Sequence, residues 1–223
     1  MNGWTIVFDL DGTLVDTAPD LVDATNHALD RYKLAPVAEP ELRQWISFGA
    51  RRMIVEALNA HNYPLGDTEV DALLDTFLAY YEANIANRSR PYPGVENALV
   101  DLKRRGATLA ICTNKRERLA RQLLTELQLI EKFSGLAGRD TYPVYKPDPE
   151  HLRGAISLAS GNPQQAVMIG DSNTDITTAR NAEIPSIAVS FGYTDIPAAK
   201  LGANAVIDHY DQLLEALEAL GLT

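Results

Sequence analysis

The chain has 223 residues, which is long enough to bury a full hydrophobic core, as one large domain or as a domain with a smaller insert. Its formal net charge of −10 at pH 7 argues against a partner such as nucleic acid, which is bound through a basic face. The single cysteine, Cys112, cannot form an intrachain disulfide, and no apolar run approaches a membrane span, so the composition predicts a cytoplasmic protein without a membrane partner.

The first predicted element is a buried strand over Thr5–Phe8, and an acidic turn follows it directly. Asp9 and Asp11 are two residues apart, so they leave the strand end together, where Gly12 lets the backbone turn sharply. Neighbouring carboxylates repel each other, and a fold rarely pairs them without a cation or a shared proton. We therefore expect Asp9 and Asp11 to belong to a site; the alternative is a solvated Asp-Gly turn.

Residues 16–90 show only helical periodicity, most clearly over Val70–Ile85. This segment is far longer than the usual crossover of about a dozen residues between parallel strands. Asp16-Thr17 resembles a helix cap at its start, and the proline- and glycine-containing stretch Pro91–Gly94 closes it. The sequence predicts a helical cap inserted after the first strand, hanging as a lid over the ligand-binding edge of the sheet.

Strands and helices then alternate to the end of the chain. The apolar strand candidates are Ala107–Cys112, Ser134–Ala137, Ala166–Ile169, Ser186–Val189 and Ala205–Ile207. Such alternation is typical of an α/β fold with a Rossmann-like parallel sheet whose two faces are covered by helices. We expect residues 1–15 and 91–223 to form this core and residues 16–90 to form the cap.

Three further polar signals follow strands of the predicted sheet or lie in loops on the same side. Thr113 and Asn114 offer a hydroxyl, an amide and backbone N–H groups before a helix, which suits an anion. Lys146 lies in a loop stiffened by two prolines, and Asp171 and Asp175 follow another strand. Each signal is common alone, but strand ends of a parallel sheet meet at one edge, so together they predict one site.

These residue types together describe the hydrolysis of a phosphate monoester. The substrate is a dianion, and Mg²⁺ held by carboxylates, with an ammonium opposite, offsets its repulsion of an attacking carboxylate. One acid then forms an aspartyl phosphate, and a second protonates the leaving oxygen and later deprotonates water. Asp9 and Asp11 supply that pair, and Asp171 with Asp175 supplies the far wall of the metal site.

With four motifs in order, the chain resembles phosphatases of the haloacid dehalogenase superfamily along its whole length. The motifs are Asp-x-Asp-Gly-Thr from Asp9, Thr-Asn from Thr113, the loop lysine Lys146 before proline, and Gly-Asp-Ser-x-x-Asp from Gly170. The resemblance implies Mg²⁺ as the cofactor and a small-molecule phosphate ester as the substrate. It leaves open whether the protein is a monomer or a homodimer.

By position, the resemblance also implies a role for each motif residue. Asp9 would be the nucleophile and a magnesium ligand, and Asp11 the general acid–base and a ligand through its backbone carbonyl. Asp171 would bind the metal, and Asp175 would support the site directly or through water. The phosphoryl group would be held by Thr113, Asn114, Lys146 and the backbone amides of the turn from Leu10 to Gly12.

Within the superfamily the chain most resembles bacterial phosphoglycolate phosphatases, through softer stretches such as Trp45–Ala50 and Phe191–Tyr193. Phosphoglycolate carries a carboxylate beside its phosphate, and a lid cation would suit it. Arg51, Arg52 and Lys115 are the candidates. The alternative for the two arginines is that they form the solvated face of a cap helix.

Asp11 separates this chain from related activities, since haloacid dehalogenases and phosphonoacetaldehyde hydrolases lack this second aspartate. Leu21 stands where β-phosphoglucomutases have a cap histidine. A phosphatase remains, with a broad sugar-phosphate phosphatase or a pyrophosphatase as alternatives. A phospho-receiver domain is disfavoured, because such domains are about half as long, have no lid and carry their phospho-aspartate away from the paired acids. An inactive binding module is disfavoured, because every reactive position is intact.

One departure from the family pattern lies at Gly138-Arg139-Asp140, after the third strand of the predicted sheet. Relatives often have an acidic residue directly after this glycine. Because Arg139 lies outside the four motifs, we expect altered loop contacts there rather than altered chemistry.

Overall fold

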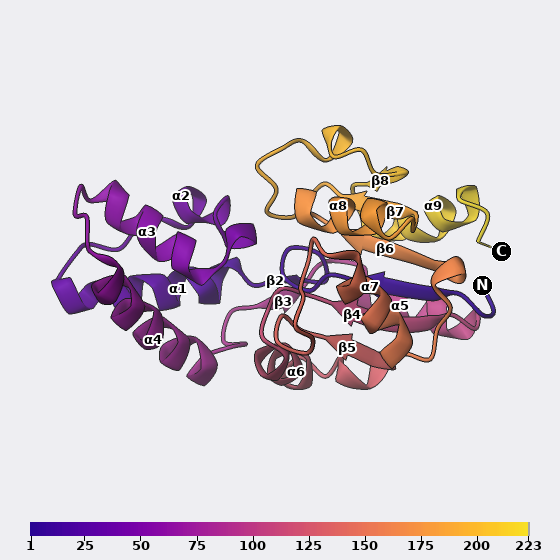
Figure 1. Cartoon of the computed structure of the whole chain (residues 1–223), viewed down its shortest axis with the longest axis horizontal. Coiled ribbons are helices and arrows are strands. Elements are labelled where there is room, and N and C mark those ends of the chain that lie inside the picture. The colour runs from indigo at the N-terminus through magenta and orange to yellow at the C-terminus, as the bar shows by residue number, and fades with distance from the viewer. Residues whose placement is uncertain (223) are drawn as a thin grey trace. The chain divides into compact units, whose positions relative to one another are not determined.

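The computed structural model describes residues 1–222 and divides the chain into two compact units (Figure 1). The core unit comprises Met1–Asp16 together with the chain from Pro91 onward, and the helical unit comprises Thr17–Arg90. The chain therefore leaves the core unit after its first strand and returns to it before the second strand of its main sheet.

The core unit is built on a parallel sheet of six strands in the order β5-β4-β1-β6-β7-β8. The strands are β1 Thr5–Phe8, β4 Thr108–Cys112, β5 Gly135–Ala137, β6 Ala166–Gly170, β7 Ser186–Val189 and β8 Ala205–Ile207. In the register of β1, Val7 lies opposite Ala110 of β4 on one side and Met168 of β6 on the other. The predicted α/β fold with a parallel sheet is confirmed, and β1, β4 and β6 are neighbours.

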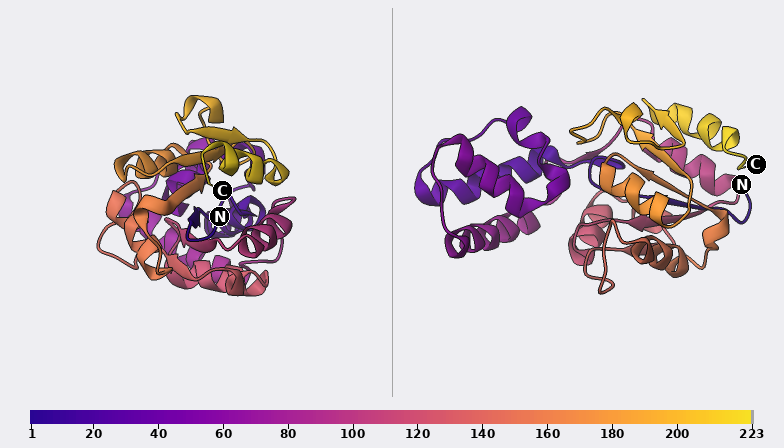
Figure 2. Two further views of the ribbon diagram at one scale, coloured as in Figure 1. Left: turned by 90° about the vertical axis from the view of Figure 1, so that its right-hand side faces the viewer. Right: turned by 45° about the horizontal axis from the view of Figure 1, so that its top comes forward.

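Helices cover both faces of this sheet (Figures 1 and 2). They are α5 Val95–Arg104, α6 Glu117–Glu126, α7 Pro149–Leu158, α8 Asn173–Asn181 and α9 Leu213–Ala219. Leu152 of α7 and Ala179 of α8 pack with Val7 on one face, while α5 and α9 contact each other on the opposite face. Because both faces are covered, β1 is buried along its whole length and reads as a continuous apolar run.

The helical unit contains α1 Ala18–Leu29, α2 Glu39–Arg43, α3 Ala50–Ala60 and α4 Asp67–Ala83. Asp20 of α1 anchors the end of this unit, since its carboxylate accepts hydrogen bonds from the backbone N–H groups of Arg88 and Ser89 and from the Ser89 hydroxyl. Thr17 stands at the N-cap position of α1, but its side chain makes no capping hydrogen bond, so the predicted cap is only positional. Among residues 1–222, no helix of either unit combines the length and hydrophobicity needed to cross a membrane.

Two short strands were not expected from the sequence. β2 (Val15–Asp16) and β3 (Arg90–Pro91) pair as a separate two-stranded sheet at the two ends of the helical insertion. Strands of two residues are too short to show alternation, which is why only helical periodicity was visible between residues 16 and 90.

Candidate active site

The central strands of the core unit place the predicted motifs side by side. Asp9 follows β1, Thr113 follows β4 and Asp171 follows β6, and these three strands are adjacent and parallel. The backbone N–H of Asp9 continues the ladder by donating to the Ile169 carbonyl at 2.9 Å. The carboxyl edge of the sheet therefore brings together motifs that lie up to about 160 residues apart in the sequence.

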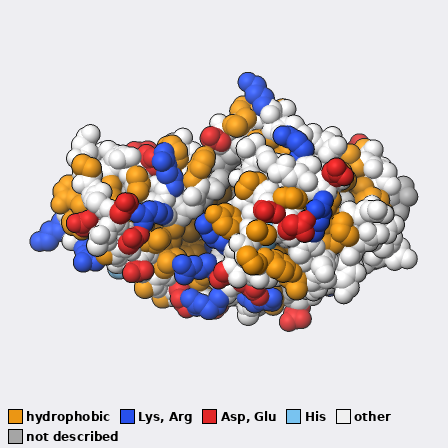
Figure 3. All heavy atoms as spheres, viewed as in Figure 1, with side chains coloured by type: hydrophobic (Ala, Val, Ile, Leu, Met, Phe, Trp, Pro, Cys, Tyr) orange, Lys and Arg blue, Asp and Glu red, His pale blue; other side chains and the backbone are white. Residues whose placement is uncertain are grey.

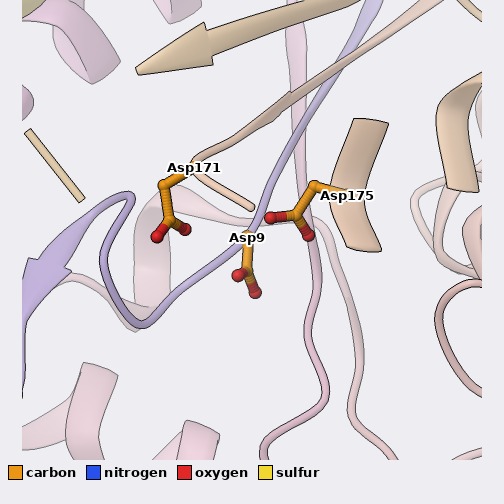
Figure 4. A group of neighbouring side chains, drawn as sticks. All are labelled: Asp9, Asp171 and Asp175. Carbon is orange, nitrogen blue, oxygen red and sulfur yellow. The ribbon is translucent and has the colours of Figure 1, made fainter. Parts of the chain in front are cut away.

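Three buried carboxylates, those of Asp9, Asp171 and Asp175, lie close together at this edge (Figure 4). One oxygen from each lies within 4.8 Å of the others. Asp175 comes from the first turn of α8, where it forms a capping box with Ser172. The arrangement concentrates negative charge in a buried space.

Lys146 supplies a buried positive charge to this cluster. Its ammonium lies 2.9 Å from Asp9 Oδ1 and 2.6 Å from Asp175 Oδ1, and the side chain is only 2% exposed. Burial alone lowers the pKa of Lys146, but the carboxylates of Asp175 and Asp9 outweigh it and raise the pKa above its usual value. Lys146 is therefore charged throughout the physiological pH range.

One ammonium does not neutralise three carboxylates. Burial raises the pKa of Asp9 to about 6, although Lys146 opposes the shift. Burial, with the nearby charges of Asp175 and Asp9, raises the pKa of Asp171 to about 8. These shifts show that the site favours an additional positive charge or a proton.

The donor set fits a hard divalent cation such as Mg²⁺. Asp9 and Asp171 offer carboxylate oxygens, which such ions prefer. Asp9 Oδ1 is buried and, despite its ion pair with Lys146, accepts no well-directed hydrogen bond. The oxygens of Asp175 are already engaged, because Oδ1 contacts Lys146 and Oδ2 accepts hydrogen bonds from the Ser172 N–H and hydroxyl.

Asp11 does not join the three buried acids. Its carboxylate is partly exposed and pairs with Lys115, whose ammonium lies 2.9 Å from Oδ1 and 3.2 Å from Oδ2. Lys115 follows Thr113 and Asn114 in the loop after β4, so this ion pair joins the loops after two adjacent strands. Lys115 thus contacts the predicted acid–base residue.

The predicted phosphate-binding groups also lie together. Asn114 Nδ2 donates to the Lys146 carbonyl at 3.0 Å, which links the loop after β4 to the lysine loop. Asn114 Oδ1 is buried and has no hydrogen-bond partner within residues 1–222. Thr113 Oγ1 accepts a hydrogen bond from the Lys115 N–H, so its own hydroxyl proton can be donated to a different acceptor.

Sequence reasoning missed the residues that orient Asp171. Thr13 Oγ1 donates to its Oδ1 at 2.9 Å, and the Tyr193 N–H donates to its Oδ2 at 2.7 Å. A side chain at Gly192 would overlap Asp171 Cβ, so glycine is required for this close approach. The stretch Phe191–Tyr193 resembles the matching stretch of relatives, but nothing in its spacing indicates this contact.

Arg51 and Arg52, the predicted substrate-binding arginines, lie on α3 of the helical unit. Arg51 pairs with Asp67 and Asp71, and Arg52 pairs with Glu56 while its guanidinium lies 4.8 Å from the centroid of the Trp45 ring. Both side chains are partly exposed. Their role toward a substrate remains a prediction.

Cys112 is inert, as expected of a buried small side chain. Burial raises the pKa of its thiol to about 12, and its Sγ lies 3.5 Å from His151 Nδ1. The buried His151 contacts the Gly138 carbonyl through Nε2 at 3.0 Å, and burial lowers its pKa. His151 is thus a satisfied core histidine that ties α7 to the ends of β4 and β5.

We expect Gly12→Ala to lower the stability of the protein by about 3 kcal/mol. Gly12 has a φ of +84°, and a Cβ there would lie 2.5 Å from Asp171 Oδ2 and 2.8 Å from Tyr193 Cδ2. Chemical denaturation measures the loss. Gly221→Ala is the matched control, because Gly221 has a φ of +87° and, among the described residues other than its chain neighbours, no atom lies within 4 Å of a Cβ placed there. The control should lose only about 1 kcal/mol; equal losses would show that the contact with Asp171 is unimportant.

Comparison with known proteins is consistent with this geometry. The model of the family described as haloacid dehalogenase-like hydrolase matches residues 6–189. The chain is 48% identical to the phosphoglycolate phosphatase of Mesorhizobium japonicum, over 93% of this chain and 92% of that protein. It is 35% identical to the N-acetylmuramic acid 6-phosphate phosphatase of Pseudomonas aeruginosa, over 96% of this chain and 94% of that protein. A crystal structure of a predicted phosphoglycolate phosphatase from Haemophilus somnus matches with a TM-score of 0.88 and 31% identity, over 96% of this chain and 98% of that one.

Proposed function

Because the chain belongs to the haloacid dehalogenase-like hydrolase family and is a phosphatase, we propose that it hydrolyses 2-phosphoglycolate with Mg²⁺ through an aspartyl phosphate on Asp9. The observation that carries this proposal is the cluster of Asp9, Asp171 and Asp175, in which the Lys146 ammonium contacts Asp9 and Asp175. A buried, charged ammonium beside a nucleophilic carboxylate suits the transfer of a phosphoryl dianion.

Asp9 and Asp171, with the backbone carbonyl of Asp11, would hold the metal. When bound there, Mg²⁺ would offset negative charge on the phosphoryl group and the attacking carboxylate. Asp175 would act through Lys146 and Ser172, since its oxygens already contact both. Thr13 and Tyr193 would fix the orientation of the Asp171 carboxylate.

Asp11 would move the proton in both halves of the reaction. It would first protonate the leaving oxygen and then deprotonate the water that attacks the phosphorus of the aspartyl phosphate on Asp9. The phosphoryl oxygens would be bound by Lys146, Thr113 and Asn114, whose loops are linked by the Asn114–Lys146 hydrogen bond. The backbone amides that precede Gly12 would complete this cradle.

The substrate proposal rests on the names of the relatives and on the cations of the chain. Phosphoglycolate phosphatases are among the relatives that share 40% or more of its sequence. The relative that acts on N-acetylmuramic acid 6-phosphate favours a sugar phosphate as the second candidate. We propose that the helical unit serves as the cap and that Arg51 or Arg52 contributes to substrate choice.

A panel of phosphate esters with and without Mg²⁺ tests the function. We expect phosphate release from 2-phosphoglycolate to fall at least about 100-fold when EDTA removes the metal and to return when Mg²⁺ is restored. The value of kcat/KM for phosphoglycolate should exceed the values for pyrophosphate, hexose phosphates and N-acetylmuramic acid 6-phosphate. Undiminished turnover in EDTA would contradict the metal site, and a higher value for a sugar phosphate would transfer the proposal to that substrate.

A further inference from the structure

Arg139 is an exposed cation in the loop after β5, at the same edge of the sheet as the acids. Its backbone N–H donates to the Lys115 carbonyl at 2.9 Å, and the Lys115 ammonium in turn contacts Asp11. Its guanidinium carbon lies 4.1 Å from the centroid of the Tyr145 ring, and Tyr145 directly precedes Lys146. Arg139 is therefore connected to both the acid–base residue and the phosphate-binding lysine.

The charge of Arg139 is not neutralised by a neighbour. Many basic side chains lie beside acidic ones, as the face drawn in Figure 3 illustrates. Arg51 pairs with two aspartates, Arg52 with Glu56 and Lys115 with Asp11. Among residues 1–222, no carboxylate forms an ion pair with Arg139, and its side-chain contact is the Tyr145 ring.

The stack also determines which part of the guanidinium remains available. When one face of the planar group lies on an aromatic ring, its N–H edge still points outward and can bind a carboxylate through two parallel hydrogen bonds. Tyr145 is 43% exposed, so the pair lies at the surface of the core unit rather than inside it. An exposed guanidinium that lies over an aromatic ring and, among residues 1–222, pairs with no carboxylate is available to bind an external anion.

We propose that Arg139, held on Tyr145, binds the second anionic group of the substrate, the carboxylate of a small carboxylated phosphate monoester. The inference rests on the proposed phosphatase function and assigns substrate choice in part to the core unit. Arg139 would then do more than alter loop contacts, which is all that the sequence suggested.

Arg139→Met tests this inference by removing the charge while keeping an unbranched chain over the ring. We expect KM for 2-phosphoglycolate to rise about 10-fold or more, because the substrate carboxylate loses charge-assisted hydrogen bonds. The value of kcat should change much less. For p-nitrophenyl phosphate, which has no carboxylate, kcat/KM should change less than about threefold. Arg139→Lys should recover part of the loss, and Tyr145→Leu should raise KM for phosphoglycolate in the same direction.

Arg104→Met is the matched control, since Arg104 is an exposed arginine at the end of α5, the helix that precedes the start of β4. Arg104→Met should leave kcat and KM unchanged for both substrates. Equal losses of kcat/KM on the two substrates in Arg139→Met would overturn the inference. So would a selective loss in Arg52→Ala with none in Arg139→Met, which would assign the carboxylate to the helical unit.

If the wild-type enzyme hydrolyses p-nitrophenyl phosphate but not phosphoglycolate, the inference falls and the phosphatase stands; if it hydrolyses neither, the proposed function falls as well.

Discussion

Asp9→Asn is expected to lower kcat for phosphate release by about 10⁴-fold or more, because it removes the attacking carboxylate. An amide keeps the shape of the side chain but is a poor nucleophile and a weaker metal ligand. Asp9 is the acid that both contacts the Lys146 ammonium and follows the central strand β1. Steady-state phosphate release with saturating Mg²⁺ measures the loss, and circular dichroism checks that the variant is folded.

Asp211→Asn is a suitable control for the Asp9 variant, because Asp211 is a largely exposed aspartate that pairs with His209. It should retain full activity. The reaction scheme also predicts that wild-type enzyme quenched in acid during turnover carries phosphate on Asp9. An Asp9→Asn variant with wild-type kcat would disprove the nucleophile assignment.

Asp171→Asn is expected to abolish magnesium-dependent turnover and, in metal-free protein, to raise the free energy of unfolding by about 5 kcal/mol at pH 8. Burial and the neighbouring acids raise the pKa of Asp171 to about 8 from the 3.8 expected in an unfolded chain. Between these values the folded state binds the proton that the unfolded state releases, so this group reduces stability as pH rises. An asparagine carries no charge and can still accept from the Tyr193 N–H.

The pH dependence gives this prediction its sign. The stability difference between Asp171→Asn and the wild type should be near zero at pH 4 and should grow as pH rises toward 8. Chemical denaturation in EDTA at several pH values measures it. Addition of Mg²⁺ should stabilise the wild type and not the variant. A variant that is less stable than the wild type at every pH would show that the Asp171 charge is not a burden in the folded protein.

Asp175→Asn is the matched comparison, and it should have the opposite effect. Both oxygens of Asp175 accept hydrogen bonds within the protein, one from the Lys146 ammonium and the other from the N–H and hydroxyl of Ser172. Its loss leaves the buried Lys146 ammonium with one carboxylate fewer, which we expect to destabilise the protein by about 2–4 kcal/mol. We therefore expect the charge of Asp171 to destabilise the folded protein and the charge of Asp175 to stabilise it, although both acids belong to one cluster.

The sheet and its motifs were predictable because they depend on local patterns. β1 and β7 have the predicted bounds, and β6 extends one residue further than predicted, to Gly170, since a strand covered on both faces must be a continuous apolar run. The position of Asp9, Thr113 and Asp171 at one edge followed from parallel strands alone. Lys146 lies in a loop, where the two prolines beside it predicted a stiffened segment on that side of the sheet but not the contacts of its ammonium with Asp9 and Asp175.

Contacts between distant side chains were decided by the tertiary structure. Periodicity and spacing predict which residues lie at the carboxyl edge of the sheet. They do not predict which of several possible donors forms a hydrogen bond with each carboxylate oxygen there. The fold gave Lys115 to Asp11, Lys146 to Asp175, and the Tyr193 N–H to Asp171. It also placed Arg139 on Tyr145, with no acidic partner among residues 1–222. These choices depend on distances of a few ångströms between loops, and no one-dimensional pattern encodes them.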